Sequence, residues 1–144
     1  MPSVFSRIIA GELPGRFVWQ DEVCVAFLSI NPVTDGHTLV VSRTEVDRWT
    51  DADEPLVLHL MSVARLIGGA QQSEWDCPRP GLLIQGFEIP HLHVHVWPTY
   101  SAQDFDLRRS QLDPDPRVLD ESGRRLRGRL RANGLGGFVP DDPR

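Results

Sequence analysis

The sequence contains no lysine, so all 15 of its basic residues are arginine. This absence excludes Schiff-base chemistry, a lysine nucleophile, and a phosphate-binding loop of the GxxxxGK type followed by serine or threonine. Whole classes of lysine-dependent enzymes and P-loop NTPases are therefore ruled out before any motif is considered.

Cysteine and long apolar runs are also scarce. Cys24 and Cys77 cannot form a disulfide framework, and neither lies in a CxxC spacing, so we expect a reducing, cytoplasmic location. No apolar run approaches the length that spans a bilayer, and the first residues lack the basic and long apolar regions of a signal peptide. We therefore expect no membrane partner and no secretion.

The formal net charge of −5 argues against a dedicated nucleic-acid-binding protein, which is normally basic. A small anionic substrate remains possible, because a site needs only a local positive potential. A chain of 144 residues with 40% hydrophobic residues can bury a core without disulfides or metal. We expect one domain over residues 1–133 and a flexible tail over residues 134–144.

Hydrophobic periodicity predicts strands on both sides of one long helix. The expected strands are 16–19, 22–28, 37–41, 82–85 and 89–97, and the expected helices are 3–10, 53–72 and 117–132. A break is expected at Pro78–Gly81, before the last two strands. This order indicates an α+β fold, with an antiparallel sheet of about five strands, a long helix and a C-terminal helix.

Three of the five histidines, His91, His93 and His95, occupy alternate positions of one predicted strand. Alternation places the imidazoles on one face and the intervening leucine and valines on the other. A merely solvated face would not need three imidazoles, so the pattern indicates a functional site. One interpretation is a zinc site. The other is phosphoryl chemistry with a neutral imidazole as the nucleophile, which we favour because the segment lacks the carboxylate of an HxHxDH pattern and has no obvious cysteine ligand.

The segment His91–Val96 resembles the histidine triad (HIT) motif, His-φ-His-φ-His-φ, in which φ is an apolar residue. Matches to the same family lie upstream, in the same order, at residues 5–14, 27–32 and 36–41, so the resemblance covers roughly residues 3–98. It implies a HIT-like fold and a metal-independent nucleotidyl hydrolase or transferase, similar to the purine nucleoside phosphoramidase branch. The implied substrates are purine nucleoside phosphoramidates or dinucleoside polyphosphates. The resemblance implies no cofactor. It also implies a homodimer.

The resemblance also implies roles for single residues. His93 would attack phosphorus and carry the nucleotide as a covalent intermediate, His95 would contact the phosphate, and His91 and His37 would orient the cluster. The residues that would contact the substrate are Val4, Phe5, Ile8, Phe27, Ser29, Ile30, Asn31, Gly86, Phe87 and Glu88. For the apolar members of this set, ordinary core packing is the alternative that the residues alone favour.

Several positions depart from the family pattern. Ser3 and Ser6 stand where many members have zinc-binding cysteines, so no zinc site is expected there. His59 aligns roughly with a further ligand of that site and is expected to be a packed helix residue. At three more positions, Ser29 stands where the family has an acidic ribose-binding residue, Phe87 where it has a glutamine, and Thr99 where it has a basic residue.

The last three departures keep a second function open, and the three histidines keep a third. One is a nucleotide-binding protein of the same fold with little catalysis, and the less favoured one is a histidine-rich metal-binding protein. A run of arginines near the C-terminus is typical of a solvated helix face, with a polyanion contact as the alternative. This run comprises Arg124, Arg125, Arg127, Arg129 and Arg131.

Overall fold

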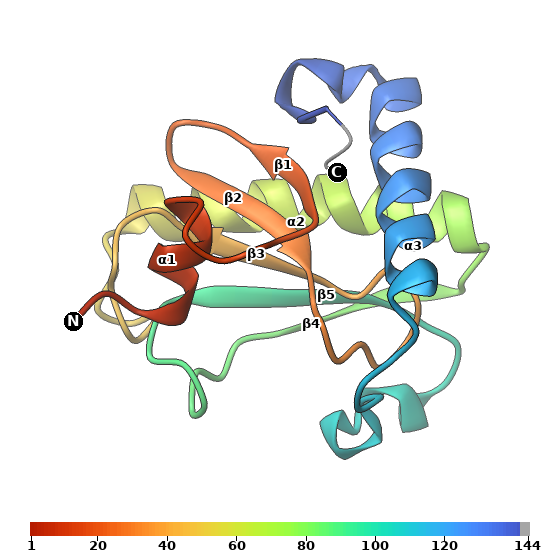
Figure 1. Ribbon diagram of the computed structural model, residues 1–144, viewed down its shortest axis with the longest axis horizontal. Helices are drawn as coiled ribbons and strands as arrows, with labels where there is room; N and C mark the ends of the chain where they lie inside the picture. Colours follow the sequence, from red (N-terminus) through yellow and green to blue (C-terminus); the bar gives the residue numbers. More distant parts are fainter. Residues whose placement is uncertain (142–144) are drawn as a thin grey trace.

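A computed structural model describes residues 1–141 and contains one antiparallel sheet in the strand order β1-β2-β3-β5-β4 (Figure 1). The strands are β1 (Phe17–Gln20), β2 (Cys24–Leu28), β3 (Thr38–Ser42), β4 (Arg79–Leu83) and β5 (His93–Thr99). The α-helices are α1 (Val4–Ile9), α2 (Glu54–Trp75) and α3 (Pro116–Leu130). The predicted fold class, with its five strands, long helix and C-terminal helix, is confirmed.

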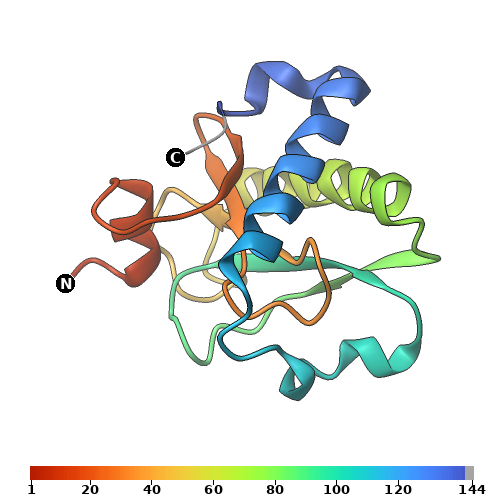
Figure 2. The same cartoon turned by 45° about the vertical axis from the view of Figure 1, so that its right-hand side comes forward.

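The two faces of the sheet carry separate apolar clusters. All five residues of β2 are buried, as expected for a central strand with apolar residues on both faces. On one face, Val40 and Val94 pack with α2 residues such as Leu60 and Ile67. On the other face a smaller cluster includes Phe5 of α1 (Figure 2). The short α1 leaves part of this second face uncovered, and the site described below lies there.

Helix α2 begins where the sequence predicts and continues a few residues further. The Asp53 side chain accepts a hydrogen bond from the Leu56 N–H, and proline occupies the first turn. Near the other end, the Gln71 side-chain amide donates to the carbonyl oxygens of Gly36 and Val96. This amide therefore fastens α2 to the start of β3 and to β5, the two segments that carry histidines.

Strand β5 differs from its prediction, because it begins at His93 rather than at residue 89. Pro90 has no N–H to donate to a ladder, and the His91 N–H turns back to the Ile89 carbonyl. The Leu92 N–H then donates to Val46, in a loop outside the sheet. His91 therefore precedes the strand.

Strand β4 also corrects the prediction, which placed a break at Pro78–Gly81 and a strand at 82–85. The strand instead runs Arg79–Leu83, and Pro80 lies opposite Pro98 of β5. Because β4 is an edge strand, a proline that lacks an N–H can be accommodated there.

Helix α3 matches its prediction closely and is followed by a turn at Arg131–Leu135 and a short 3₁₀ helix at Gly136–Phe138. The sequence predicted a flexible tail over residues 134–144. In the structure, Leu135 and Val139 pack against the main core, and the Phe138 ring stacks on Trp19 with 4.6 Å between ring centroids. This stretch is packed because its apolar side chains cover the indole of β1. Residues 142–144 of the predicted tail lie outside the described residues.

No helix among residues 1–141 is both long enough and apolar enough to cross a membrane.

Candidate active site

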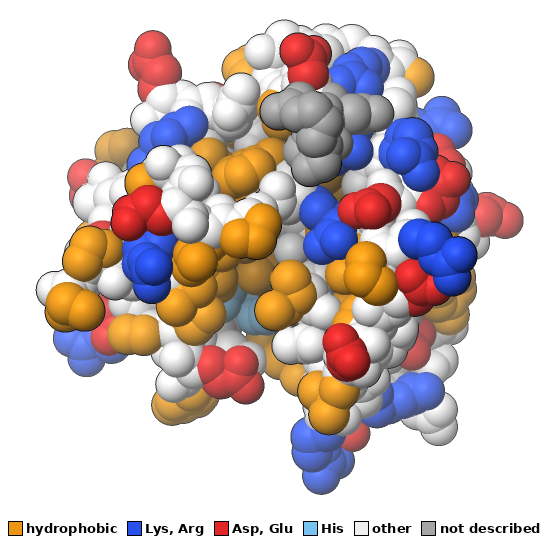
Figure 3. Space-filling model, in the orientation of Figure 1, with side chains coloured by type: hydrophobic (Ala, Val, Ile, Leu, Met, Phe, Trp, Pro, Cys, Tyr) orange, Lys and Arg blue, Asp and Glu red, His pale blue; other side chains and the backbone are white. Residues whose placement is uncertain are grey.

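A pocket of about 820 Å³ opens on the sheet face that carries α1, between α1 and α3. His37, His93 and His95 line it. Figure 3 shows histidine side chains at the bottom of a hollow, with hydrophobic side chains around it and charged side chains toward α3. Two further 3₁₀ helices, Ala102–Phe105 and Leu107–Arg109, follow β5, and the second contributes to the rim.

The structure brings most of the predicted substrate-binding residues to this pocket. Those that line it are Val4, Phe5, Ile8, Phe27, Ser29, Ile30, Asn31, Gly86 and Glu88. We call the contribution of the first helix, Val4, Phe5 and Ile8, the α1 wall.

Phe87 does not line the pocket. Its side chain is 93% exposed, next to Gly86, whose φ of +95° is a left-handed conformation that favours glycine. The neighbouring Gln85 does line the pocket, so this loop places an amide there from the position before the glycine. Sequence reasoning missed Gln85, because it sought the amide after the glycine.

The hydrogen bonds of His93 fix its tautomer. Its Nδ1 lies 2.6 Å from the His91 carbonyl oxygen, which can only accept, so Nδ1 carries the proton and Nε2 has the lone pair. The Phe5 ring stands edge-on to this imidazole, with 4.8 Å between ring centroids. His93 is thus held in one orientation by a backbone carbonyl and by the α1 wall.

His95 has the other tautomer, with its proton on Nε2 rather than on Nδ1 as in His93. The Val33 N–H donates to His37 Nδ1 at 3.0 Å, so the proton of His37 is on Nε2. That Nε2 donates to His95 Nδ1 at 3.0 Å, which leaves the proton of His95 on its Nε2. The pocket therefore holds two neighbouring imidazoles, one with a lone pair on Nε2 and one with an N–H there. Their ring centroids are 5.0 Å apart.

Burial keeps these imidazoles neutral. Together with a smaller effect of a neighbouring imidazole, it lowers the pKa of His37 to about 3 and that of His95 to about 4. Burial also lowers the pKa of His93, and the bond to the His91 carbonyl offsets part of this effect. At neutral pH the lone pair of His93 is therefore available to react.

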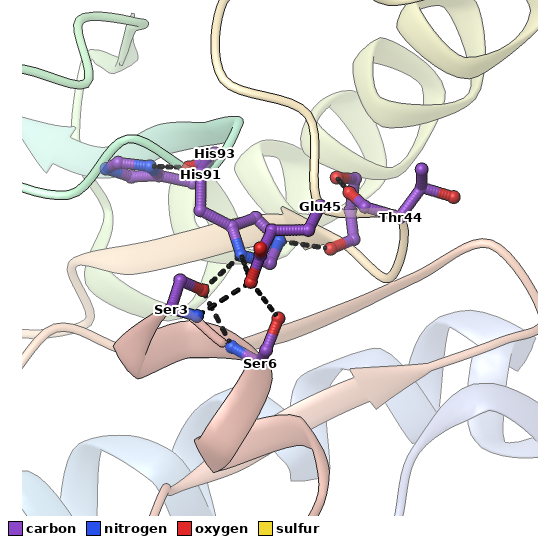
Figure 4. Close-up of polar contacts among 7 residues, drawn as sticks. Ser3, Ser6, Thr44, Glu45, His91 and His93 are labelled. Atoms are coloured by element: carbon purple, nitrogen blue, oxygen red, sulfur yellow. Dashed lines mark hydrogen bonds and ion pairs between the residues drawn. The ribbon is translucent and has the colours of Figure 1, made fainter. Parts of the chain in front are cut away.

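His91 lies behind this pair, fully buried, and does not line the pocket. Its Nε2–H donates to the Ser42 carbonyl at 2.7 Å, so its Nδ1 accepts from the Ser3 hydroxyl at 2.5 Å (Figure 4). Ser3 is also the N-cap of α1. Because the His91 carbonyl holds His93, a short chain of hydrogen bonds joins the start of α1 to His93.

A carboxylate that sequence reasoning missed completes this cluster. Glu45 accepts from the Ser3 N–H and from the Ser6 hydroxyl, each at 2.7 Å (Figure 4). These bonds hold the pKa of Glu45 below its usual range, the Ser3 N–H contributing most. The loop around Glu45 carries no motif, so only the fold could place it beside Ser3 and Ser6.

The cluster does not fit a structural zinc ion. Such sites use thiolates and imidazoles, whereas this one offers two neutral hydroxyls and a carboxylate beside His91. Each of these groups is already occupied by a hydrogen bond within the cluster. Hydrogen bonds therefore link α1 to the histidine segment here.

His59 lies elsewhere, on α2. Its Nε2 contacts the Asp21 carboxylate at 2.8 Å, and Cys24 lies beside them, with all three potential metal-binding atoms within 4.8 Å of one another. Asp21 also accepts from the Trp19 indole and from the N–H groups of Val23 and Cys24. Such a saturated carboxylate stabilises the β1–β2 turn, and none of these residues lines the pocket.

The side of the pocket opposite α1 carries arginines that the sequence did not assign to a site. The C-terminal arginine run predicted a solvated face, yet two of its members line the pocket, together with Arg16 and Asp120. We call Arg16, Asp120, Arg124 and Arg127 the α3 wall.

Comparisons with known proteins identify a family. The HIT domain family model matches residues 10–102. An uncharacterised HIT-like protein of Methanocaldococcus jannaschii is 33% identical over 103 residues, covering 69% of this chain and 80% of that protein.

Two solved structures are similar over most of the chain. A zinc-bound histidine triad family protein of Mycobacterium smegmatis has a TM-score of 0.78 at 29% identity, covering 92% of this chain and 96% of that one. A hypothetical histidine triad nucleotide-binding protein of Sulfolobus tokodaii has a TM-score of 0.78 at 28% identity, covering 89% and 91%. With the family model matching well over half of the sequence, this chain belongs to the HIT domain family.

Proposed function

We propose that the protein is a metal-independent nucleotidyl hydrolase or transferase that acts on nucleoside phosphoramidates or dinucleoside polyphosphates. The observation that carries the proposal is the pair of neutral imidazoles with opposite tautomers. His93 offers a lone pair and His95 offers an N–H, both in the same pocket. A nucleophile beside a proton donor is the arrangement that a two-step displacement at phosphorus needs.

In the first step, His93 Nε2 attacks the α-phosphorus, and the bond from phosphorus to the leaving nitrogen or oxygen breaks. His95 Nε2–H donates a hydrogen bond to the leaving atom, which takes up a proton from water as it departs. The imidazole of His93 gains positive charge as the nitrogen–phosphorus bond forms, and the His91 carbonyl stabilises that charge through the proton on Nδ1. The product is a nucleotidyl-His93 intermediate.

In the second step, water attacks the same phosphorus and releases a proton to the solvent, which replaces the proton that the leaving group took up. The nitrogen–phosphorus bond breaks, the nucleoside monophosphate leaves and His93 returns to its starting tautomer. An alcohol or amine in place of water would make the reaction a transfer. Two in-line displacements retain the configuration at phosphorus.

The nucleoside would lie against the apolar part of the pocket. Phe5 and Ile8 face it from α1, and Phe27 and Ile30 from the end of β2 and the loop after it. The pocket volume of about 820 Å³ is within the usual range for small-molecule sites. The similarity to a nucleotide-binding protein of Sulfolobus tokodaii supports the same ligand class.

The test is to incubate the protein with adenosine and guanosine phosphoramidates and with dinucleoside polyphosphates, in the presence and absence of EDTA. We expect turnover that EDTA does not reduce, and a nucleotide adduct on His93 that is acid-labile and visible by mass spectrometry. Loss of turnover in EDTA, or an adduct on another residue, would contradict the mechanism.

A nucleotide-binding protein with little catalysis is the second candidate, and the exposure of Phe87 favours it, because that side chain cannot contact a phosphate in the pocket. Tight AMP binding without turnover of any of these substrates would select it. The homodimer expected from the resemblance stays a prediction, which the mass of the protein in solution tests.

A further inference from the structure

The α3 wall takes no part in the chemistry proposed above, yet it lines the same pocket as the histidines. Asp120, Arg124 and Arg127 follow one another at intervals of four and three residues, so they share one face of α3. Arg16 joins them from the segment before β1, through an ion pair of 2.7 Å to Asp120. Two elements therefore combine to place guanidinium groups opposite the α1 wall.

Two of these arginines have hydrogen-bond donors to spare. Arg16 uses its Nε to bond Asp120, and Arg124 uses its Nε to bond Glu121 at 2.9 Å. A guanidinium has five N–H donors. Within residues 1–141, the Nη groups of Arg16 and Arg124 make no hydrogen bond. Each side chain is thus held by its Nε, while its Nη groups remain able to bind an anion.

The charge of the pocket has the sign that an anion needs. Four arginines and two carboxylates line it, although the whole chain has a formal net charge of −5. They are Arg16, Arg108, Arg124 and Arg127, with Glu88 and Asp120.

The position of Arg16 relates the α3 wall to the nucleoside part of the pocket. The Leu28 N–H donates to the Arg16 carbonyl, which places Arg16 beside the end of β2, next to Ser29. Ser29 is neutral, and its hydroxyl accepts from the Asn31 N–H. In other nucleotide sites, a carboxylate near the ribose suits free hydroxyls, whereas a nearby arginine accommodates a ribose phosphate. A neutral serine beside an arginine is compatible with a phosphate on the ribose.

We propose that the α3 wall is a second phosphate site, which binds a phosphate of the nucleotide other than the one that His93 attacks. Guanidinium groups bind phosphate through paired N–H donors, and Arg16 and Arg124 both have such pairs to offer. The inference rests on the proposed function, because that function places the first phosphate at His93 and His95. The second phosphate is either a ribose 2′- or 3′-phosphate or the next phosphate of a polyphosphate chain.

Calorimetry on the full chain tests the site without requiring turnover. The ligands are AMP, adenosine 2′,5′-bisphosphate, adenosine 3′,5′-bisphosphate and α,β-methylene-ADP, whose phosphate chain resists cleavage. We expect at least one of the last three to bind about 10-fold more tightly than AMP, since a charge-assisted hydrogen bond contributes on this scale. The ligand that gains affinity identifies where the second phosphate is attached.

Arginine variants then connect that gain to the α3 wall. Arg124→Ala should abolish it while leaving AMP affinity within about 2-fold, because the Arg124 side chain is 57% exposed and its removal opens no core. Arg16→Ala should reduce it as well. The matched control is Arg117→Ala, on the same helix but outside the pocket, with a side chain that is 90% exposed. This control should keep the full gain.

Three outcomes would overturn the inference. They are AMP as the tightest ligand, a gain that survives in both Arg124→Ala and Arg16→Ala, and a loss of the gain in Arg117→Ala as large as in those two variants. If AMP and the three other ligands all fail to bind, the proposed function fails together with the second phosphate site. If AMP binds and only the gain is missing, the proposed function stands alone.

Discussion

The two walls of the pocket are attached to the rest of the site in different ways. The α1 wall is joined to His93, the proposed nucleophile, because Ser3 at its start bonds His91 and the His91 carbonyl bonds His93. Phe5 of the same helix packs directly on His93. Any displacement of α1 should therefore change the position of His93.

The α3 wall is joined to β1 instead. Arg16 and Asp120 form one link, and the bond from Arg127 Nη1 to the Phe17 carbonyl forms another. No hydrogen bond between residues 1–141 runs from this wall to an imidazole. We therefore expect changes at the α1 wall to alter the rate of chemistry and changes at the α3 wall to alter affinity.

The largest effect on rate is expected for His93→Ala, which removes the nucleophile itself. We expect kcat for a nucleoside phosphoramidate to fall by at least about 1,000-fold, with no adduct by mass spectrometry. Because His93 lies on the pocket side of the sheet, the circular dichroism spectrum should be unchanged. Residual activity within about 10-fold of wild type would exclude His93 as the nucleophile.

Ser3→Ala tests whether the α1 wall acts through His91. Without the Ser3 hydroxyl, His91 loses the donor to its Nδ1 and His93 loses part of its support, so kcat should fall about 10-fold with KM little changed. Ser3→Thr keeps a hydroxyl and should restore most of the rate.

The matched control for that variant is Ser6→Ala. Ser6 bonds Glu45, as the Ser3 N–H does, but makes no bond to His91. If both alanine variants lower kcat equally, or if Ser3→Ala raises KM alone, the hydrogen-bonded route to His93 is wrong. The helix would then matter only as a wall of the pocket.

The depressed histidine pKa values predict how activity depends on pH. With the pKa of His95 at about 4 and that of His93 also lowered, kcat/KM should hold its neutral value well below the ordinary histidine pKa of 6.5. Its acid limb should have an inflection below 6.5. A limb centred at 6.5 would show that the imidazoles are not desolvated.

The same groups should make the fold less stable in acid. Below pH 6.5 the unfolded chain binds protons on His37 and His95, whereas the folded chain does not until about pH 3 and 4. Stability should therefore decrease as the pH falls through this window, by up to about 1.4 kcal/mol per pH unit for each histidine. Urea unfolding of wild type and His37→Gln at pH 7 and pH 5 measures this, and the variant should have the smaller slope.

Local pattern predicted the elements that build the α1 face. The alternation of histidine with Leu92, Val94 and Val96 placed the apolar side chains in the core and the imidazoles on the other face, although the strand begins only at His93. Such patterns are readable because strand and helix periodicities are properties of neighbouring residues. The edge strand β4 was misplaced because a proline such as Pro80 usually indicates a break in a strand. Only the pairing with β5 shows that Pro80 lies within an edge strand.

Contacts between residues far apart in the chain could not be predicted from the sequence. Glu45 meets Ser3 across 42 positions, and Arg16 meets Asp120 across 104. Nothing in the neighbourhood of either pair specifies its partner, because the fold brings them together. Both walls of the pocket are held by such pairs, which is why the histidines that line the pocket could be found from the sequence and the arginines opposite them could not.

The smallest effect on activity is expected for Phe138→Ala, which tests whether the packing beside the α3 wall affects turnover. The Phe138 ring stacks on Trp19 of β1, the strand to which the α3 wall is attached, and its side chain does not line the pocket. Because Phe138 is 42% exposed, its loss should lower the free energy of unfolding by about 1–2 kcal/mol, less than for a fully buried phenylalanine. Urea unfolding measures this, with Phe138→Leu expected to be intermediate. Turnover of a nucleoside phosphoramidate should stay within about 2-fold of wild type, since within residues 1–141 the hydrogen bond and ring contacts of the His93 imidazole are made with His91, Phe5 and His95 and not with β1. A loss of kcat as large as that of Ser3→Ala would mean that the two walls are coupled through β1, and that rate and affinity are not divided between them.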